Sequence, residues 1–241
     1  MKHSLLLLTA VLVIGCTSKD APDAYTAQPE APVAVTGPDP GNVGRSPEGV
    51  VPASWRWRFD RGSDYTVGTD ADSADTYFVT MTPGWHLTTK PAGIFYHPDG
   101  VGSGNFTAST QIYLFDPGDR NEGYGMIVGG SDLEGPDQQY LYFLVRRSGE
   151  FLIKVRRGAE TEDVQGWTAH EAVAAWTEGS GPTLENVLSV AVGDETITFS
   201  VNGAQVASIP RADRPTDGVV GLRINHGTNV HVADLSVAPA A

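Results

Sequence analysis

Five residues on two predicted strands have the chemistry to bind a sugar. Tyr140, Tyr142 and Arg146 share one face of an alternating segment, and His86 and Lys90 share one face of another. Tyrosine rings can stack on the apolar faces of pyranoses while their hydroxyl groups hydrogen-bond, and His and Lys can donate to sugar hydroxyls. We therefore expect these residues to form a ligand-binding surface. The alternatives are packing of the tyrosines under a covering loop and a plain solvent-facing position for His86 and Lys90.

Basic residues are concentrated on the hairpin that also carries the two tyrosines, at Arg146, Arg147, Lys154, Arg156 and Arg157. Guanidinium groups pair bidentately with carboxylate and phosphate, so recognition of an acidic sugar or a phosphate is one interpretation. The other is pairing with the many Asp and Glu of the chain, together with protection of a sheet edge.

A carboxylate-dense segment contains Asp70, Asp72 and Asp75. Calcium takes six to eight hard oxygen ligands, and loops of this kind hold it in many β sandwiches. The glycine and the terminal glutamate of an EF-hand loop are missing, so a plain turn is the alternative. Calcium is the one cofactor that the sequence suggests.

Motifs for catalysis are absent from the sequence. It contains no His-Glu-x-x-His zinc motif, no Gly-x-Ser-x-Gly elbow and no phosphate-binding glycine loop. The acidic run at residues 160–163 is expected to be a solvated loop. We therefore expect a non-catalytic protein that binds a glycan or a cell-envelope component, with a carbohydrate hydrolase and a structural or adhesion protein of the envelope as alternatives.

Short alternating segments separated by Gly, Pro and Asp recur from Ser54 onward, which predicts an all-β fold over residues 54–238. Asn202-Gly203 and Ser148-Gly149 each join two such segments and predict hairpin turns. Only residues 169–176, rich in alanine, suggest a helical turn.

The order of these segments resembles the concanavalin A-like lectin and glucanase jelly rolls. The resemblance rests on residues 140–146, 149–154, 166–168, 186–190, 199–203 and 218–223, and it covers about Trp55 to Val237. In order and spacing the chain is similar to exported bacterial domains of the 3-keto-disaccharide hydrolase-like group. The resemblance implies a two-sheet antiparallel jelly-roll sandwich with a concave face that binds sugar in many relatives. Laminarinase-type relatives carry a Glu-x-Asp-x-x-Glu strand, which this chain lacks, so no catalytic residue is carried over.

The N-terminal segment predicts where the protein is held. A positive start and a short apolar run end at Gly15-Cys16, which matches a bacterial lipoprotein processing site, so residues 1–15 are expected to be a signal peptide and Cys16 to be lipidated. Residues 16–53, rich in Pro and Ala, would form a tether. We expect a domain in the bacterial cell envelope that contacts the membrane only through its anchor. The net charge of -13 argues against nucleic acid as a partner.

Overall fold

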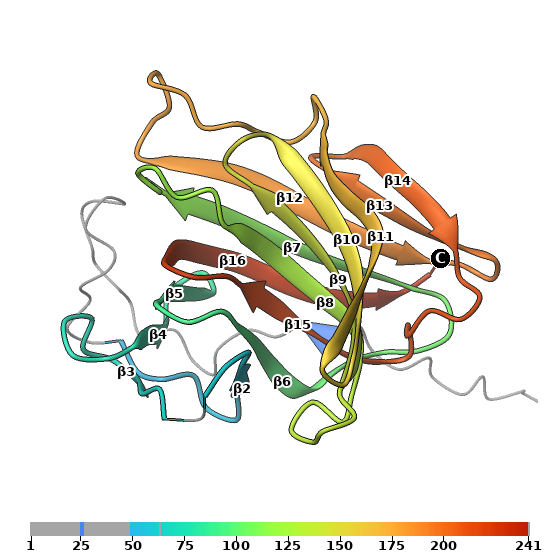
Figure 1. Cartoon of the computed structure of the whole chain (residues 1–241), viewed down its shortest axis with the longest axis horizontal. Coiled ribbons are helices and arrows are strands. Elements are labelled where there is room, and N and C mark those ends of the chain that lie inside the picture. Colours follow the sequence, from blue (N-terminus) through green and yellow to red (C-terminus); the bar gives the residue numbers. More distant parts are fainter. Residues whose placement is uncertain (1–24, 27–48, 63, 241) are drawn as a thin grey trace, which may run out of the picture.

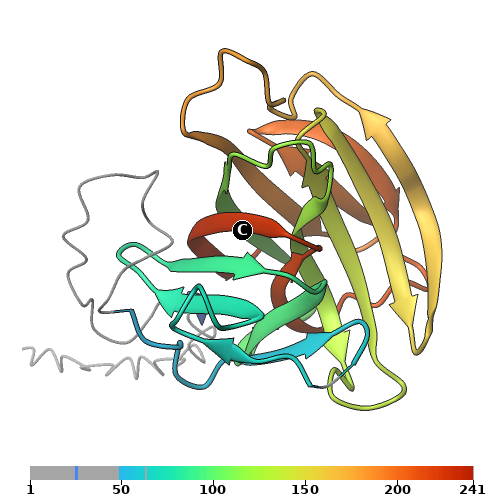
Figure 2. The same cartoon turned by 60° about the vertical axis from the view of Figure 1, so that its left-hand side comes forward.

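Two β-sheets packed face to face make up the part of the chain that the computed structural model describes, residues 25–26, 49–62 and 64–240 (Figure 1). The nine-stranded sheet contains, in spatial order, β14 (Ala204–Pro210), β13 (Thr196–Val201), β12 (Thr183–Val192), β7 (Phe106–Phe115), β16 (Thr228–Pro239), β5 (Trp85–Thr89), β4 (Thr76–Thr80) and β3 (Val67–Gly68), and β1 (Tyr25–Thr26) pairs with β16. The seven-stranded sheet contains β11 (Glu160–Ala169), β10 (Glu150–Arg157), β9 (Gln139–Arg146), β8 (Gly123–Ser131), β15 (Gly218–Ile224), β6 (Gly93–Gly102) and β2 (Arg56–Phe59). Figures 1 and 2 show β9 to β11 in one layer and β12 to β14 in the other.

The described residues contain no helix, and every strand pair except β3 with β4 is antiparallel. This confirms the predicted all-β, two-sheet jelly-roll sandwich. The fold follows from strict alternation: on β9, for example, Leu141, Phe143 and Val145 point between the sheets, whereas the residues between them point outward.

Aromatic side chains from both sheets meet in the core. Phe143 of β9 lies 5.2 Å from Phe199 of β13, measured between ring centroids, and both side chains are fully buried. Trp55 and Trp85 make a second contact of this kind at 4.7 Å. Rings of this size bury large apolar areas, so these contacts hold the two layers together.

A second apolar cluster lies on the outer face of the seven-stranded sheet. We call it the outer cluster, and its buried members are Ile94, Tyr96, Ile127, Leu133, Tyr140, Tyr142, Leu144 and Leu152. Leu133 belongs to the loop between β8 and β9, which therefore covers part of this face. A strand that is apolar on both faces, as β9 is, has one face in the core and the other under this cover.

The Asn202-Gly203 hairpin is confirmed between β13 and β14. Both residues have positive φ angles, 50° and 82°, as a type I′ turn requires. The Asn202 side chain also accepts a hydrogen bond from the backbone N–H of Val187 at 2.8 Å and donates one to the carbonyl of Ala172 at 2.8 Å. This turn residue therefore ties the hairpin to its neighbours. The Ser148-Gly149 hairpin between β9 and β10 is confirmed as well.

Residues 160–163 are strand, so their prediction as a loop is wrong. They begin β11, where Asp163 lies opposite Lys154 and Glu160 lies opposite Arg157 of β10. An edge strand has only one neighbour and leaves its other side in water, so it tolerates charges that a central strand would not. Charges on the edge also discourage pairing with a second molecule.

The helical turn predicted at residues 169–176 does not form. The Nδ1 atom of His170 accepts a hydrogen bond from the backbone N–H of Ala172, and the His170 carbonyl accepts one from Val173. These bonds close a single turn, after which the chain runs on without regular structure. The alanine content alone was a poor guide because the local side-chain bond competes with helix formation.

The predicted signal peptide, Cys16 and most of the tether lie outside the described residues. Within residues 16–53, only β1 and the segment from Gly49 onward are described. β1 pairs with Ser236–Val237, on the edge of β16 that is left open past the end of β5. In the described part of the chain, no helix has the length and apolarity needed to cross a membrane.

Candidate functional site

The five predicted ligand-binding residues lie on opposite sides of the sandwich. His86 is on the outer face of β5 in the nine-stranded sheet, and Lys90 directly follows this strand. Tyr140, Tyr142 and Arg146 are on the outer face of β9 in the seven-stranded sheet. The prediction of one shared surface is therefore wrong, because alternation within each strand could not show which sheet the strand belongs to.

His86 is fully buried rather than solvent-facing. Its ring packs edge-on against Tyr77 and Phe115, with centroid distances of 5.8 and 5.3 Å, and it lies directly opposite His231 of β16. Burial, with a smaller contribution from the charge of His231, lowers the pKa of His86 to about 3. Burial also lowers the pKa of His231 to about 4. Both histidines are therefore neutral near pH 7.

Acidification is expected to destabilise the fold through these two histidines. Below a pH of about 6.5 the unfolded chain takes up protons that the folded chain refuses, so the free energy of unfolding falls by about 1 kcal/mol per histidine at pH 5.5. The loss continues until the pH reaches the folded pKa values. Urea unfolding at pH 7.0, 6.0 and 5.5 measures it. The double variant His86→Gln/His231→Gln should show a flatter profile than the wild type. An unchanged slope in the double variant would contradict the assignment.

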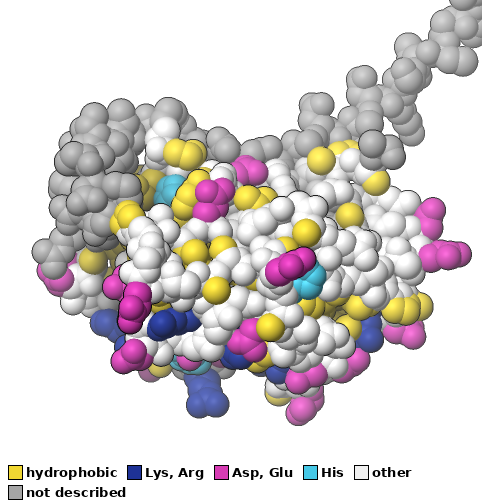
Figure 3. All heavy atoms as spheres, turned by 90° about the horizontal axis from the view of Figure 1, so that it is seen from above, with side chains coloured by type: hydrophobic (Ala, Val, Ile, Leu, Met, Phe, Trp, Pro, Cys, Tyr) yellow, Lys and Arg dark blue, Asp and Glu magenta, His cyan; other side chains and the backbone are white. Residues whose placement is uncertain are grey.

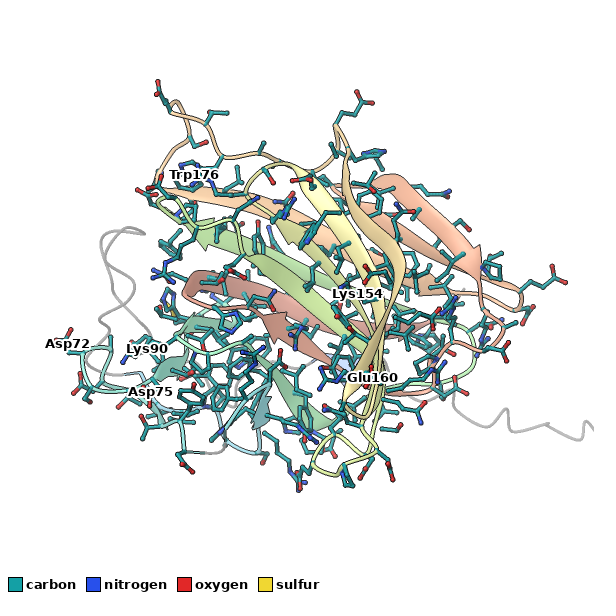
Figure 4. The ribbon with its side chains drawn as sticks, viewed as in Figure 1. Asp72, Asp75, Lys90, Lys154, Glu160 and Trp176 are labelled. Carbon is teal, nitrogen blue, oxygen red and sulfur yellow. The ribbon has the colours of Figure 1, made fainter. Side chains whose placement is uncertain are left out.

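The carboxylates of Asp70 and Asp75 accept hydrogen bonds from donors within the 70–75 loop and beside it. Asp70 accepts hydrogen bonds from the backbone N–H of Asp72 at 3.0 Å and from the hydroxyl of Ser73 at 2.7 Å. Asp75 accepts two from Thr66 and pairs with Lys90 at 3.5 Å. In Figure 4, Asp72 lies at the outer edge of the molecule, apart from Asp75 and Lys90.

These carboxylates do not fit the predicted calcium site. A calcium ion needs oxygen ligands that converge on one point, whereas the carboxylates of this loop accept bonds from different donors around it. Across the described ranges, no group of three or more His, Cys, Asp or Glu is arranged to hold a metal ion. Residues 71–73 form a turn, and calcium binding at this loop stays a prediction.

Tyr140 and Tyr142 are covered. Their residues are 1% and 7% exposed, and their rings lie 5.7 Å apart within the outer cluster. Burial raises the pKa of Tyr142 to about 12. The structure thus agrees with the alternative of packing under a covering loop, and the two rings leave little area for a sugar to stack on.

Arg223 of β15 packs over these tyrosines. Its guanidinium lies 5.2 Å from the centre of the Tyr142 ring and donates two hydrogen bonds to the carboxylate of Asp60, at 2.6 and 2.9 Å. Burial alone would raise the pKa of Asp60, but the hydrogen bonds and charge of Arg223 offset it and hold this pKa below the usual value. The Asp60–Arg223 pair is therefore ionised, and it holds the Arg223 side chain in place over the tyrosines.

Trp167 is the accessible aromatic ring of this face. It comes from β11, is half-buried, and packs on the outer cluster. Two register shifts between β10 and β11 accompany this placement, and bulges of this kind re-aim side chains. A Cβ atom at Gly123 would come within 3.0 Å of the Trp167 ring, so glycine there lets the indole lie close to the sheet.

Arg146 holds this ring in place. Its guanidinium lies 4.2 Å from the centre of the Trp167 ring, an arrangement that favours the cation over the aromatic face. The same guanidinium pairs with Glu150 at 2.7 Å, and the side chains of Arg146 and Glu150 are only 20% and 22% exposed. Arg146 thus orients the Trp167 ring, and its ion pair with Glu150 restricts the conformations of the Arg146 side chain.

Six cationic residues share the outer face of the seven-stranded sheet, which we call the basic face: Arg56, Arg58, Arg146, Lys154, Arg156 and Arg223. They are more than a third of the 16 Lys and Arg of an acidic chain. Figure 4 labels Lys154 on this side of the molecule. In Figure 3 the visible Lys and Arg side chains gather in the lower half of the view, the side that faces the reader in Figure 1.

The predicted basic hairpin contributes three of these residues: Arg146, Lys154 and Arg156. Arg157 instead lies on the opposite side of the strand's alternation and donates to Gln139 and to the carbonyl of Asp213. Arg223, Arg56 and Arg58 come from other strands, and no motif in the sequence marked them. Register alone brings them to one face, because Arg58 and Arg223 both lie opposite Ile94.

No family model matches the chain, and no curated protein sequence matches it. Solved structures do. The carbohydrate-binding module CBM66 from Bacillus subtilis superposes with a TM-score of 0.52 at 10% identity, covering 76% of this chain and 94% of that one.

Two further structures have the same architecture. A protein of unknown function with a galectin-like fold, from Bacillus subtilis, has a TM-score of 0.52 at 12% identity and covers 78% and 90% of the two chains. The exoplasmic/lumenal domain of VIP36 in its Ca²⁺-bound form has a TM-score of 0.53 at 10% identity, over 78% and 84%. The chain therefore has a lectin-like jelly-roll fold.

Proposed function

We propose that this chain is a non-catalytic carbohydrate-binding domain and that its ligand lies on the basic face, against Trp167. The observation that carries the proposal is the half-buried Trp167 ring, oriented by Arg146 on a face lined by hydrogen-bonding side chains. The fold neighbours give independent support. One is a carbohydrate-binding module, and the VIP36 domain also has a Ca²⁺/Man2-bound form, with a TM-score of 0.50 at 10% identity over 78% of this chain and 81% of that one.

The face has the two kinds of group that sugar recognition needs. The indole offers an apolar surface for the C–H face of a pyranose. On the same pair of strands, Lys154 and Asp163 form an ion pair at 2.6 Å, in which the Asp163 side chain is 60% exposed. Asp163 and Trp167 are four residues apart on β11, a separation of at most about 13 Å at 3.3 Å per residue and shortened by the register shifts in this stretch, so one short oligosaccharide is long enough to contact both.

Prearranged polar groups favour binding because little freedom is lost when the sugar arrives. Lys154 already pairs with Asp163, and Arg146 already pairs with Glu150. Each of these groups still has lone pairs or N–H donors for a sugar hydroxyl. Side chains that are already ordered reduce the entropic cost of association.

The proposal includes the location of the domain. We infer a lipid-anchored protein of the bacterial cell envelope, because a short apolar run precedes Gly15-Cys16 and a segment rich in Pro and Ala follows it. The anchor would hold the domain near a glycan-bearing surface, and the acidic chain would keep the domain itself off anionic lipid.

Trp167→Ala is expected to weaken binding of the full chain to its best oligosaccharide at least tenfold, since the stacking surface is lost. A glycan array identifies the ligand, and titration calorimetry measures the affinity. The matched control is Trp57→Ala, which removes an exposed tryptophan (36% exposed) from the other side of the same sheet. Equal affinities in the wild type and Trp167→Ala would rule out this site. No binding to any glycan would defeat the proposed function, and cleaved products would point to a hydrolase.

A further inference from the structure

We propose that the glycan bound by the basic face is acidic, and that Arg58 and Arg156 bind its carboxylate groups. This inference rests on the proposed function and adds the chemical class of the ligand. It starts from a difference among the six cations of the basic face. Four of them have a carboxylate partner among the described residues, and two do not.

Each of the four paired cations is neutralised by a carboxylate of the protein itself. The closest nitrogen–oxygen distances are 2.6 Å for Arg56–Glu134, 2.7 Å for Arg146–Glu150, 2.6 Å for Lys154–Asp163 and 2.6 Å for Arg223–Asp60. These pairs agree with the interpretation that cations of the basic hairpin pair with Asp and Glu of the chain itself. They leave no net positive charge for a ligand.

Arg58 and Arg156 form no ion pair with any residue that the structure describes. One terminal nitrogen of Arg58 donates to the carbonyl of Leu133 at 3.0 Å and also to that of Gly135. The Nε atom of Arg156 donates to the carbonyl of Gly158 at 2.6 Å. Carbonyl groups hold these guanidinium groups in place without neutralising them, so each keeps its full charge and further N–H donors.

Arg58 comes from β2, at one edge of the seven-stranded sheet, and Arg156 from β10, next to the other edge strand, yet both act on the same group between them. Arg156 lies directly opposite Tyr140 of β9, and Arg58 and Arg223 lie on either side of Ile94. Arg58, Arg156 and Arg223 are all close enough to the Tyr140 hydroxyl to act on it electrostatically. Asp60 is the carboxylate in this group, and Arg223 already binds it.

Both guanidinium groups are reachable, since Arg58 and Arg156 are half-buried, whereas Arg223 is only 7% exposed. A guanidinium with two free N–H groups binds a carboxylate through two parallel hydrogen bonds, stronger than those between neutral groups. A neutral sugar would leave these charges partly desolvated and uncompensated, which costs binding energy. A sugar that carries a carboxylate, a uronic acid, compensates them.

Titration calorimetry of the full chain against a uronic acid oligomer, a neutral hexose oligomer of equal length and poly-glutamate tests the inference. We expect the uronic acid oligomer to bind at least tenfold more tightly than the other two, and to weaken as NaCl rises from 50 to 500 mM. Arg156→Gln and Arg58→Gln should each reduce this affinity about tenfold, and neither should weaken binding of the neutral oligomer, because the charge that the neutral sugar leaves uncompensated is removed. The control Arg157→Gln removes a charge from the same strand, off the basic face.

Thermal melts check that each variant folds, and Arg156→Lys, which keeps the charge but loses the two-pronged geometry, gives a second variant with an intermediate loss. Equal binding of the acidic and neutral oligomers, unchanged in Arg156→Gln, would overturn the inference and leave the proposed function standing. If poly-glutamate bound as tightly as the uronic acid oligomer, the inference that the acidic ligand is a sugar would be overturned. No binding of any glycan would defeat both proposals.

Discussion

Phe143→Ala is expected to lower the free energy of unfolding by about 3–5 kcal/mol. Phe143 is fully buried on β9, and its ring contacts Phe151 of the same sheet at 6.3 Å and Phe199 of the other sheet at 5.2 Å. Truncation removes the apolar area of the ring and leaves a cavity that rigid strands on both sides cannot fill. Urea unfolding of the full chain, followed by tryptophan fluorescence, measures the change.

Two variants calibrate this result. Phe143→Leu keeps most of the volume and should cost less than half as much, because a smaller cavity remains. Val101→Ala removes an apolar side chain that is 47% exposed and should change the free energy of unfolding by less than about 0.5 kcal/mol. If Phe143→Ala cost no more than Val101→Ala, Phe143 would not join the two sheets as described.

Asp60→Asn is expected to lower the free energy of unfolding by about 3 kcal/mol near pH 7. The substitution leaves the guanidinium of Arg223, whose side chain is only 9% exposed, without a charged partner. The Nε atom of Arg223 already has no hydrogen-bond partner among the described residues, so Asp60 is its principal support. We expect a loss between that for an exposed ion pair and that for a fully buried one, because the Asp60 side chain is 27% exposed.

The pH dependence and two controls identify the cause of the loss at Asp60. The pKa of Asp60 is lowered in the folded state, so the pair contributes its full stability above the usual carboxyl pKa and loses it as the pH falls through the folded value. Glu134→Gln, in the pair with Arg56 whose side chains are 56% and 62% exposed, should cost much less than Asp60→Asn, because water screens an exposed pair. Adding Arg223→Met to Asp60→Asn should recover most of the loss, and a further loss instead would contradict the account.

The fold was predictable because alternation and turn chemistry act locally. Segments such as 106–115 and 196–201 begin and end as strands where the alternation does, and Asn202-Gly203 turns where its φ preferences require. β11 was missed because its acidic start resembles a solvated loop, and partners distant in the sequence, such as Lys154 opposite Asp163 and Arg214 paired with Glu162, make those charges acceptable in a strand. A local pattern cannot include a partner from a neighbouring strand.

The site was less predictable because it depends on which strands become neighbours. Strand order places Arg58, Arg223 and Arg156 on one face, although they are far apart in the sequence. The same order separates His86 from Tyr140 and puts them in different sheets. Tyr140 and Tyr142 were correctly placed on one face, but no local pattern shows that Leu133, in the loop between β8 and β9, packs back onto that face.

The two strands that come last in the described part of the sequence, β15 and β16, occupy central places, one in each sheet. β15 lies between β8 and β6, and β16 lies between β7 and β5. While the protein is being synthesised, the chain emerging from the ribosome therefore contains the outer strands of each layer before it contains the strand that joins them. Pairings between residues so distant in sequence also form slowly. Neither layer can therefore be completed before β15 and β16 have been synthesised.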